Sequence, residues 1–161
     1  MVKQEITSKT NIEEVKNLVN NRFRFYRYLS GVEAKENGNA IEITVPAADL
    51  FYPGHANLRA DAKREIRDFV DTVTSRLSGH RVQVEGHTDN EPVKNNLKEY
   101  GSNWELSSAR ASAFVREFEK EGFPKTKLGA VGYGASRPLV PNTDYDGKVI
   151  LVNRLKNRRL V

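Results

Sequence analysis

The chain has 161 residues, with 26 Lys or Arg and 21 Asp or Glu, a net charge of +5 and a pI near 9.5. This length predicts one domain with a core of useful size. The absence of cysteine excludes disulfides, thiol catalysis and thiolate zinc sites, and no apolar run approaches the ~20 residues that span a bilayer. The positive charge favours anionic partners such as nucleic acid, anionic lipid or an acidic cell-wall polymer, but it equally serves solubility.

Near the N-terminus, apolar residues recur at three- and four-residue steps, which predicts an amphipathic helix over about residues 11–29. The end of this stretch, residues 22–28, alternates arginines with aromatic residues. Such a pattern could stack on single-stranded nucleic acid, but aromatic side chains facing a core while the arginines face water would also explain it. Asn37-Gly38 predicts a turn. We expect residues 1–39 to form an N-terminal linker and helical segment, and residues 40–161 to form the main domain.

Strand and helix patterns alternate from residue 40 onward. The predicted strands are 40–45, 81–85, 127–133 and 158–161, and the predicted helices are 58–77, 103–121 and 147–157. Short strands that alternate with helices of about 15–20 residues are typical of an α/β fold. The sequence therefore predicts a two-layer α/β sandwich with its helices on one face of the sheet.

A long polar loop, residues 86–101, leads into a helix that carries an arginine at an apolar position. Ser102 and Glu105 have the spacing of a capping box, which predicts that the helix begins there. Leu106, Arg110 and Phe114 are four residues apart and share one helix face. Because an unpaired buried charge is costly, the guanidinium of Arg110 requires an anion nearby.

Asp89 follows the strand and Arg110 lies on the second turn of the next helix, so both side chains should lie near the junction of these elements. Three alternatives remain open from the residues alone. The first is a plain ion pair between Asp89 and Arg110. The second is a clamp in which Arg110 holds a carboxylate and Asp89 an ammonium, with help from the amides of the helix start. The third, a metal site or general base on His87-Thr88-Asp89 with Glu85, has little support because the other two histidines lie in unrelated segments.

Several motifs, in order along the chain, resemble the OmpA-like peptidoglycan-binding domain. They are VEGHTD at residues 84–89, Asn103-x-x-Leu106-Ser107-x-x-Arg110-Ala111, GYGASRP at 132–138, NRLKNRR at 153–159, and Leu50-Phe51-x-x-Gly54 before the second helix. The resemblance covers roughly residues 40–161. It implies a βαβαβ(α)β mixed sheet with helices on one face plus an N-terminal helix.

The resemblance also implies a function and a site. It implies a non-catalytic module, without cofactor or metal, that binds the diaminopimelate of the peptidoglycan stem peptide. Asp89 and Arg110 fall on the positions of the ligand-holding pair. The residues that match neighbouring positions of the family's site are Thr88, Asn90, Asn103, Leu106 and Arg154.

Within this family, the long loop and residues 102–107 are most similar to MotB proteins, which anchor the flagellar motor stator to the wall. This similarity implies the periplasmic domain of an inner-membrane protein, a homodimer, and a channel-forming partner subunit bound through a transmembrane part. A wall anchor of an outer-membrane protein, lipoprotein or non-flagellar motor complex is the alternative. We do not expect nucleic acid as a partner, and a basic single-strand-binding module is a remote alternative. The connecting segment at residues 143–152 is longer than the segment that usually stands at this place in the family.

Overall fold

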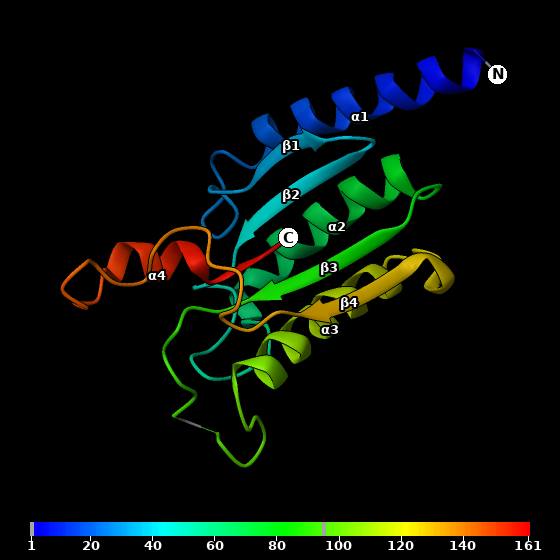
Figure 1. Cartoon of the computed structure of the whole chain (residues 1–161). Coiled ribbons are helices and arrows are strands. Elements are labelled where there is room, and N and C mark those ends of the chain that lie inside the picture. The colour runs from blue at the N-terminus through cyan, green and yellow to red at the C-terminus, as the bar shows by residue number, and fades with distance from the viewer. Residues whose placement is uncertain (1, 95) are drawn as a thin grey trace.

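The computed structural model describes residues 2–94 and 96–161, with side chains from residue 12 onward. Its elements, in chain order, are α1 (Val2–Arg22), β1 (Glu33–Asn37), β2 (Ala40–Pro46), α2 (Lys63–Leu77), β3 (Val82–His87), α3 (Asn103–Lys120), β4 (Leu128–Gly132), α4 (Leu151–Asn157) and β5 (Arg159–Leu160) (Figure 1). Short 3-10 turns at Ala60–Ala62 and Lys125–Lys127 precede α2 and β4. None of the described helices has both the length and the apolar composition that crossing a membrane requires.

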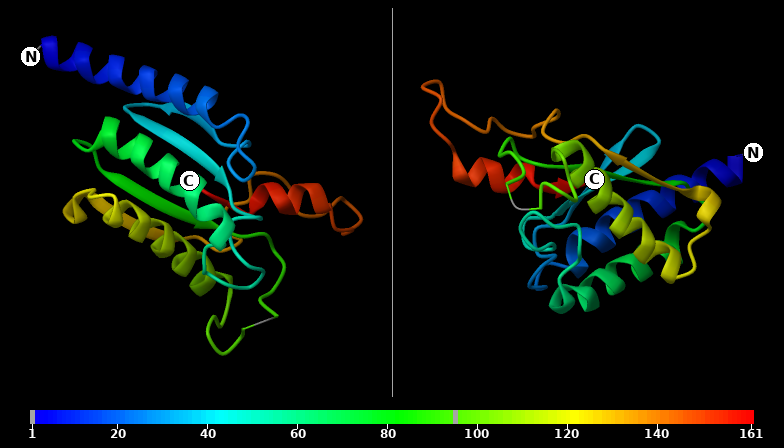
Figure 2. Two further views of the ribbon diagram at one scale, coloured as in Figure 1. Left: turned by 180° about the vertical axis from the view of Figure 1, so that it is seen from behind. Right: turned by 90° about the horizontal axis from the view of Figure 1, so that it is seen from below.

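The strands form one mixed sheet in the order β1-β2-β5-β3-β4. β3 and β4 are parallel, whereas the other neighbouring strands are antiparallel. The helices α1, α2 and α3 lie on one face of this sheet, and α4 projects beyond its end (Figure 2). The predicted α/β sandwich, its mixed sheet and its order of strands and helices from residue 40 onward are confirmed.

Between the helices and the sheet lies one large hydrophobic core, together with a smaller cluster at the base of the long loop. The buried residues of α2 follow the predicted helical stripe and are Ile66, Phe69, Val70, Thr72, Val73 and Leu77. Phe69 lies at the centre of a row of rings, 5.6 Å from Phe23 and 6.0 Å from Phe114 between centroids. Burial of such side chains, each contributing about 1.5–3 kcal/mol, is the main force that holds the helices on the sheet.

The first helix ends earlier than the periodicity predicts, at Arg22 instead of near residue 29. The carboxylate of Glu65 on α2 accepts hydrogen bonds from the backbone amides of Arg27, Tyr28 and Leu29, at 2.9, 2.8 and 3.2 Å. These amides therefore bind a side chain from another helix instead of continuing the i to i−4 ladder. The predicted end of this helix was wrong because a tertiary contact redirects the backbone.

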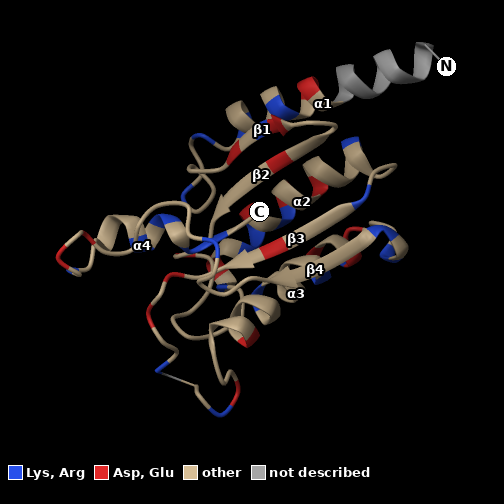
Figure 3. Cartoon of the chain, viewed as in Figure 1, with Lys and Arg blue, Asp and Glu red and all other residues tan. Residues whose placement is uncertain are grey.

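The alternating aromatic and basic residues of this stretch have different surroundings. Phe23 is buried in the core, whereas Phe25 is 93% exposed. Arg22 pairs with Asp68 at 2.8 Å, and the hydroxyl of Tyr26 donates to the same carboxylate. These contacts show that the stretch serves in part to hold the N-terminal segment against α2. Charged residues of both signs are also spread over the rest of the chain in the view of Figure 3.

The strand β1 was not predicted, because its residues are mostly polar and only Ala34 among them is buried. Asn20 of α1 satisfies the outer edge of this strand: its side-chain amide donates to the carbonyl of Ala34 at 3.0 Å and accepts from the amide of Ala34 at 2.7 Å. The predicted turn at Asn37-Gly38 is confirmed, with φ 61° at Gly38. The buried side chains between residues 15 and 34 belong to the same hydrophobic core as those of the sheet. The predicted division of the chain into two parts at residue 39 stays a prediction.

The close approach of α3 to the sheet depends on a glycine. A Cβ atom on Gly86 would lie 2.2 Å from the carbonyl oxygen of Ser107. Any other residue at position 86 would therefore require the backbone to shift. This contact brings the start of α3 directly beside the end of β3. As a result, the loop that follows β3 and the first turns of α3 face each other, as the sequence predicts.

Candidate functional site

A pocket of about 220 Å³ opens where β3 ends and α3 begins. Four separate segments line it: the loop before α2, the loop after β3, the first turns of α3, and Arg158 at the end of α4. Its lining residues are Ala48, Pro53, Gly54, Thr88, Asp89, Glu91, Pro92, Val93, Lys94, Asn103, Leu106, Arg110 and Arg158. Of the seven predicted site residues, five line this pocket: Thr88, Asp89, Asn103, Leu106 and Arg110.

Asp89 lies at the floor of this site, and it is only 4% exposed. One carboxylate oxygen, Oδ1, accepts a hydrogen bond from the amide of Glu91 at 2.9 Å. The other, Oδ2, accepts from Nε of Arg158 at 2.5 Å, which is also an ion pair. Such a charge-assisted contact inside the protein is strong because little water competes for it.

Arg110, on the second turn of α3, also lines the pocket and is half-buried. Its Nε donates to the backbone carbonyl of His55 at 2.9 Å, and one terminal nitrogen lies 3.5 Å from the carbonyl of Tyr52. Its guanidinium carbon is 5.0 Å from the centre of the Phe51 ring. Burial, followed by the positive charge of Arg158, lowers the pKa of Arg110 from its ordinary value to about 10, although Asp89 acts in the opposite direction.

The structure does not contain the direct Asp89–Arg110 ion pair that the sequence offered as one alternative. Asp89 pairs with Arg158 instead, and among the side chains that the structure describes no acidic group forms an ion pair with Arg110. Backbone carbonyls carry only partial negative charge, so they do not neutralise a guanidinium. Arg110 therefore retains a net positive charge that can accept an external anion.

The loop after β3 is held in place by three of the predicted residues. Thr88 is buried, its amide donates to the carbonyl of Gly134 at 2.9 Å, and its hydroxyl donates to the carbonyl of Asp89 at 2.9 Å. Asn103 at the start of α3 donates to the carbonyls of Glu91 at 2.9 Å and Asp89 at 3.4 Å. Leu106 is buried in the small apolar cluster beneath the loop. These residues position the loop as well as lining the pocket.

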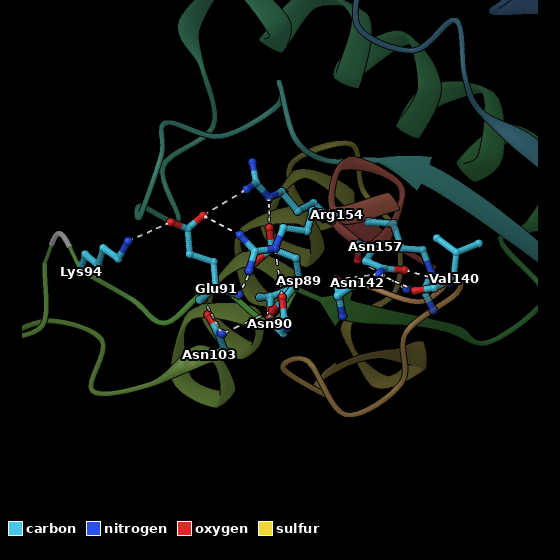
Figure 4. Close-up of polar contacts among 12 residues, drawn as sticks. Asp89, Asn90, Glu91, Lys94, Asn103, Val140, Asn142, Arg154 and Asn157 are labelled. Carbon is cyan, nitrogen blue, oxygen red and sulfur yellow. Dashed lines mark hydrogen bonds and ion pairs between the residues drawn. The ribbon is translucent and has the colours of Figure 1, made fainter. Parts of the chain in front are cut away.

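Asn90 and Arg154, the remaining two predicted residues, lie beside the pocket and not in its lining. They bind each other, because Nε of Arg154 donates to Oδ1 of Asn90 at 3.0 Å (Figure 4). A terminal nitrogen of Arg154 also lies 4.0 Å from Glu91. Both residues therefore support the outer edge of the loop.

Sequence reasoning missed three charged residues that line the pocket, Arg158, Glu91 and Lys94. Arg158 bridges Asp89 and Glu91, with a terminal nitrogen 3.5 Å from the Glu91 carboxylate. Lys94 also pairs with Glu91, at 3.1 Å, and this contact, followed by the more distant Arg154 and Arg158, lowers the pKa of Glu91. Arg158 belongs to the quoted NRLKNRR motif, but nothing in that motif indicates a partner 69 positions away.

Asn157 fixes the segment that carries Arg158. It is fully buried, and its Oδ1 accepts from the amides of Leu139 and Val140 at 2.8 and 3.1 Å. Its Nδ2 donates to the carbonyl of Val140 and to Oδ1 of Asn142, both at 2.8 Å (Figure 4). This one side chain thus anchors the irregular connection that precedes α4.

His87 does not line the pocket. It is buried, its ring stacks on Tyr133 at 5.4 Å, and Nε2 lies 3.4 Å from Glu85. Burial lowers the pKa of His87. Within the described residues, no three His, Cys, Asp or Glu side chains are grouped so that they could hold a metal ion. His87 therefore offers neither a base nor a ligand to the pocket that contains Asp89 and Arg110.

Residues 50–150 match the OmpA family. Motility protein B of Bacillus subtilis (strain 168) is 29% identical over 153 residues, which cover 92% of this chain and 54% of that protein. Among solved structures, a MotB-like protein from Desulfovibrio vulgaris is 27% identical with a TM-score of 0.77, covering 96% of this chain and 95% of that one. The cell wall anchor of the T6SS from Pseudomonas aeruginosa, 24% identical, shares the fold with a TM-score of 0.66, covering 81% and 85%.

The chain spans about half the length of the curated relatives it matches. The family match covers more than half of the chain, and it includes the loop after β3 and the whole of α3. The chain therefore belongs to the OmpA family, with MotB-like domains among its relatives.

Proposed function

We propose that this pocket binds peptidoglycan noncovalently and that the domain thereby anchors a larger protein to the cell wall. The observation that carries the proposal is the half-buried guanidinium of Arg110, which lines the pocket and contacts backbone carbonyls in place of a carboxylate. A planar guanidinium matches a carboxylate through two parallel hydrogen bonds. Membership of the OmpA family and the similarity to motility protein B support a role at the wall.

The ligand that best fits the pocket carries a carboxylate and an ammonium on one carbon. Arg110 would hold the carboxylate, and Asp89 on the facing segment would hold the ammonium. Diaminopimelate in the peptide stem of peptidoglycan has such an amino-acid end. Thr88, Asn103 and Leu106 would fix the walls, while Asn90 and Arg154 would hold the rim. The proposed activity is binding alone, in which no covalent bond is made or broken.

The larger assembly is part of the same proposal. We infer that the domain is the periplasmic part of an inner-membrane stator protein, which acts as a homodimer and joins a channel-forming subunit through transmembrane segments. The similarity to motility protein B over 92% of this chain supports this inference. Swimming motility of cells that lack the gene would test it: loss of swimming, restored by the full gene, is expected.

A second candidate is a wall anchor in an outer-membrane protein, a lipoprotein or a non-flagellar complex. The shared fold with the cell wall anchor of the T6SS favours this candidate. The pocket would bind the same ligand in both cases. Cells that swim normally without the gene would favour the second candidate over the stator.

Retention of the purified domain by insoluble peptidoglycan tests the binding directly. Arg110→Ala and Asp89→Ala should each abolish co-sedimentation, because each removes one half of the clamp. Arg116→Ala is the matched control, since Arg116 is an exposed arginine on the same helix and should leave retention unchanged. Thermal unfolding of each variant separates lost binding from a lost fold. Sedimentation of folded Arg110→Ala and Asp89→Ala at the parent level would contradict the proposal.

A further inference from the structure

We propose that Arg158 covers Asp89 in the free site and turns to Glu91 when the ligand's ammonium arrives. This inference rests on the proposed function and adds a positioning residue to it. Both oxygens of Asp89 already accept hydrogen bonds, one from the amide of Glu91 and one from Arg158. The side chain of Asp89 is only 5% exposed, whereas that of Arg158 is 33% exposed. Arg158 is therefore the more exposed partner of this pair, and it occupies the Asp89 oxygen that does not bind the amide of Glu91.

Glu91 provides a second partner for the same guanidinium. Nε of Arg158 binds Asp89 at 2.5 Å, while a terminal nitrogen of Arg158 lies 3.5 Å from Oε2 of Glu91. The guanidinium has five N–H donors in one plane, so it can exchange one carboxylate for another through rotation of its side chain. Asn157 holds the adjoining backbone through four hydrogen bonds, so the backbone can remain in place during this exchange.

The charges around the pocket favour this exchange. Arg154, Arg158 and Lys94 pair with two carboxylates, those of Asp89 and Glu91, while Arg110 lines the same pocket without joining these pairs. When an ammonium takes Asp89, the displaced Arg158 remains close to Glu91, so no charge is left unpaired. The ligand's carboxylate would then bind Arg110, which forms no ion pair with any acidic side chain that the structure describes. A ligand end that carries both groups can pair with Asp89 and with Arg110, whereas an amine or a carboxylate alone can pair with only one of them.

A double-mutant cycle tests the exchange, with meso-diaminopimelate as the ligand and titration calorimetry as the measurement. Glu91→Gln should weaken binding about two- to fivefold, the range for a partly exposed ion pair, because Arg158 loses its alternative partner. Arg158→Gln should not weaken binding, because it removes the group that competes for Asp89. In the Arg158→Gln background, Glu91→Gln should have no further effect.

Three results would overturn the exchange. One is an equal loss from Glu91→Gln in both backgrounds, which would mean that Glu91 contacts the ligand independently. A second is loss of binding in folded Arg158→Gln, which would make Arg158 a direct contact. The third is unchanged binding in Glu91→Gln. If Arg158→Gln fails to fold, Arg158→Lys replaces it, because one ammonium cannot bridge both carboxylates in the same way. If the parent protein binds neither diaminopimelate nor insoluble peptidoglycan, the proposed function itself is wrong. If the parent binds and Glu91→Gln binds equally well, only the exchange is wrong.

Discussion

The helix-covered core and the pocket at the end of the sheet are held together by different kinds of contact. In the core, apolar side chains such as Phe69 lie on stripes that each helix presents by its own periodicity. In the pocket, the contacts join residues far apart in sequence: 69 positions separate Asp89 from Arg158, and 55 separate His55 from Arg110. Each element thus specifies its part of the core locally, whereas the pocket forms only when four segments are already in place. Changes in the core should lower stability, and changes in the pocket should mainly alter binding.

The largest effect on stability is expected at the centre of the core. Phe69→Ala should lower the free energy of unfolding by about 3–5 kcal/mol, because it removes a buried ring that packs on Phe23 and Phe114. Urea unfolding measures this loss. Phe25→Ala is the matched control, since Phe25 is 93% exposed and its removal should change stability by less than about 0.5 kcal/mol. Equal losses in both variants would contradict the assignment of the core.

Asn157 connects the two regions, because a buried polar side chain there supports the segment that carries Arg158. Asn157→Ala should cost about 2–3 kcal/mol, since it leaves partly buried backbone groups of Leu139 and Val140 without partners. Asn153→Ala removes a single exposed hydrogen bond to Pro141 and should cost less than about 0.5 kcal/mol. A stability of Asn157→Ala equal to that of the control would mean that the connection before α4 is held by other contacts.

The sequence predicts the core better than the pocket, and the reason is physical. The stripe of α2 and the helix start at Ser102 depend on neighbouring residues, and both are found in the structure, where the Ser102 hydroxyl accepts from the amide of Trp104 and donates to Glu105. The end of α1 depends on Glu65, which lies 36–38 positions away and therefore leaves no local pattern. Family motifs placed Asp89 and Arg110 in one pocket.

The sequence did not predict which charged residues form ion pairs within that pocket. The contact between Asp89 and Arg158 follows from the three-dimensional course of α4 and β5, and no spacing in the chain encodes it. Glu91 was missed for a related reason, because its partners come from its own loop and from the end of α4. Residue types thus indicate that a charged site exists, but the fold decides which charges pair.

The charge of Arg110 should make binding sensitive to alkaline pH. Burial lowers its pKa to about 10, so retention by peptidoglycan should weaken about tenfold or more between pH 9 and 11. The folded-state pKa lies below the ordinary value for arginine, so loss of this proton favours the folded state, and this group does not promote unfolding as the pH rises. Circular dichroism monitors the fold over the same range. Unchanged retention at pH 11 would contradict a role for the charged guanidinium.

The smallest effect on stability is expected where α1 meets the sheet. Asn20→Ala should lower stability by about 1–2 kcal/mol, because the side-chain amide pairs with both backbone groups of Ala34. Hydrogen exchange of the Ala34 amide should accelerate in this variant. Asn21→Ala, which removes an exposed bond to the carbonyl of Asn17, should change neither quantity measurably. Equal exchange rates at Ala34 in both variants would show that β1 does not depend on α1.

The central claim is that the pocket between β3 and α3 binds the amino-acid end of the peptidoglycan stem. Its most direct test is an NMR titration of the folded domain with meso-diaminopimelate, followed through the backbone amides. We expect the largest shifts at Thr88, Asp89, Asn103 and Arg110, with little change at Phe69 in the core. Shifts confined to residues 22–28, or to the surroundings of His87 and Tyr133, would contradict the claim.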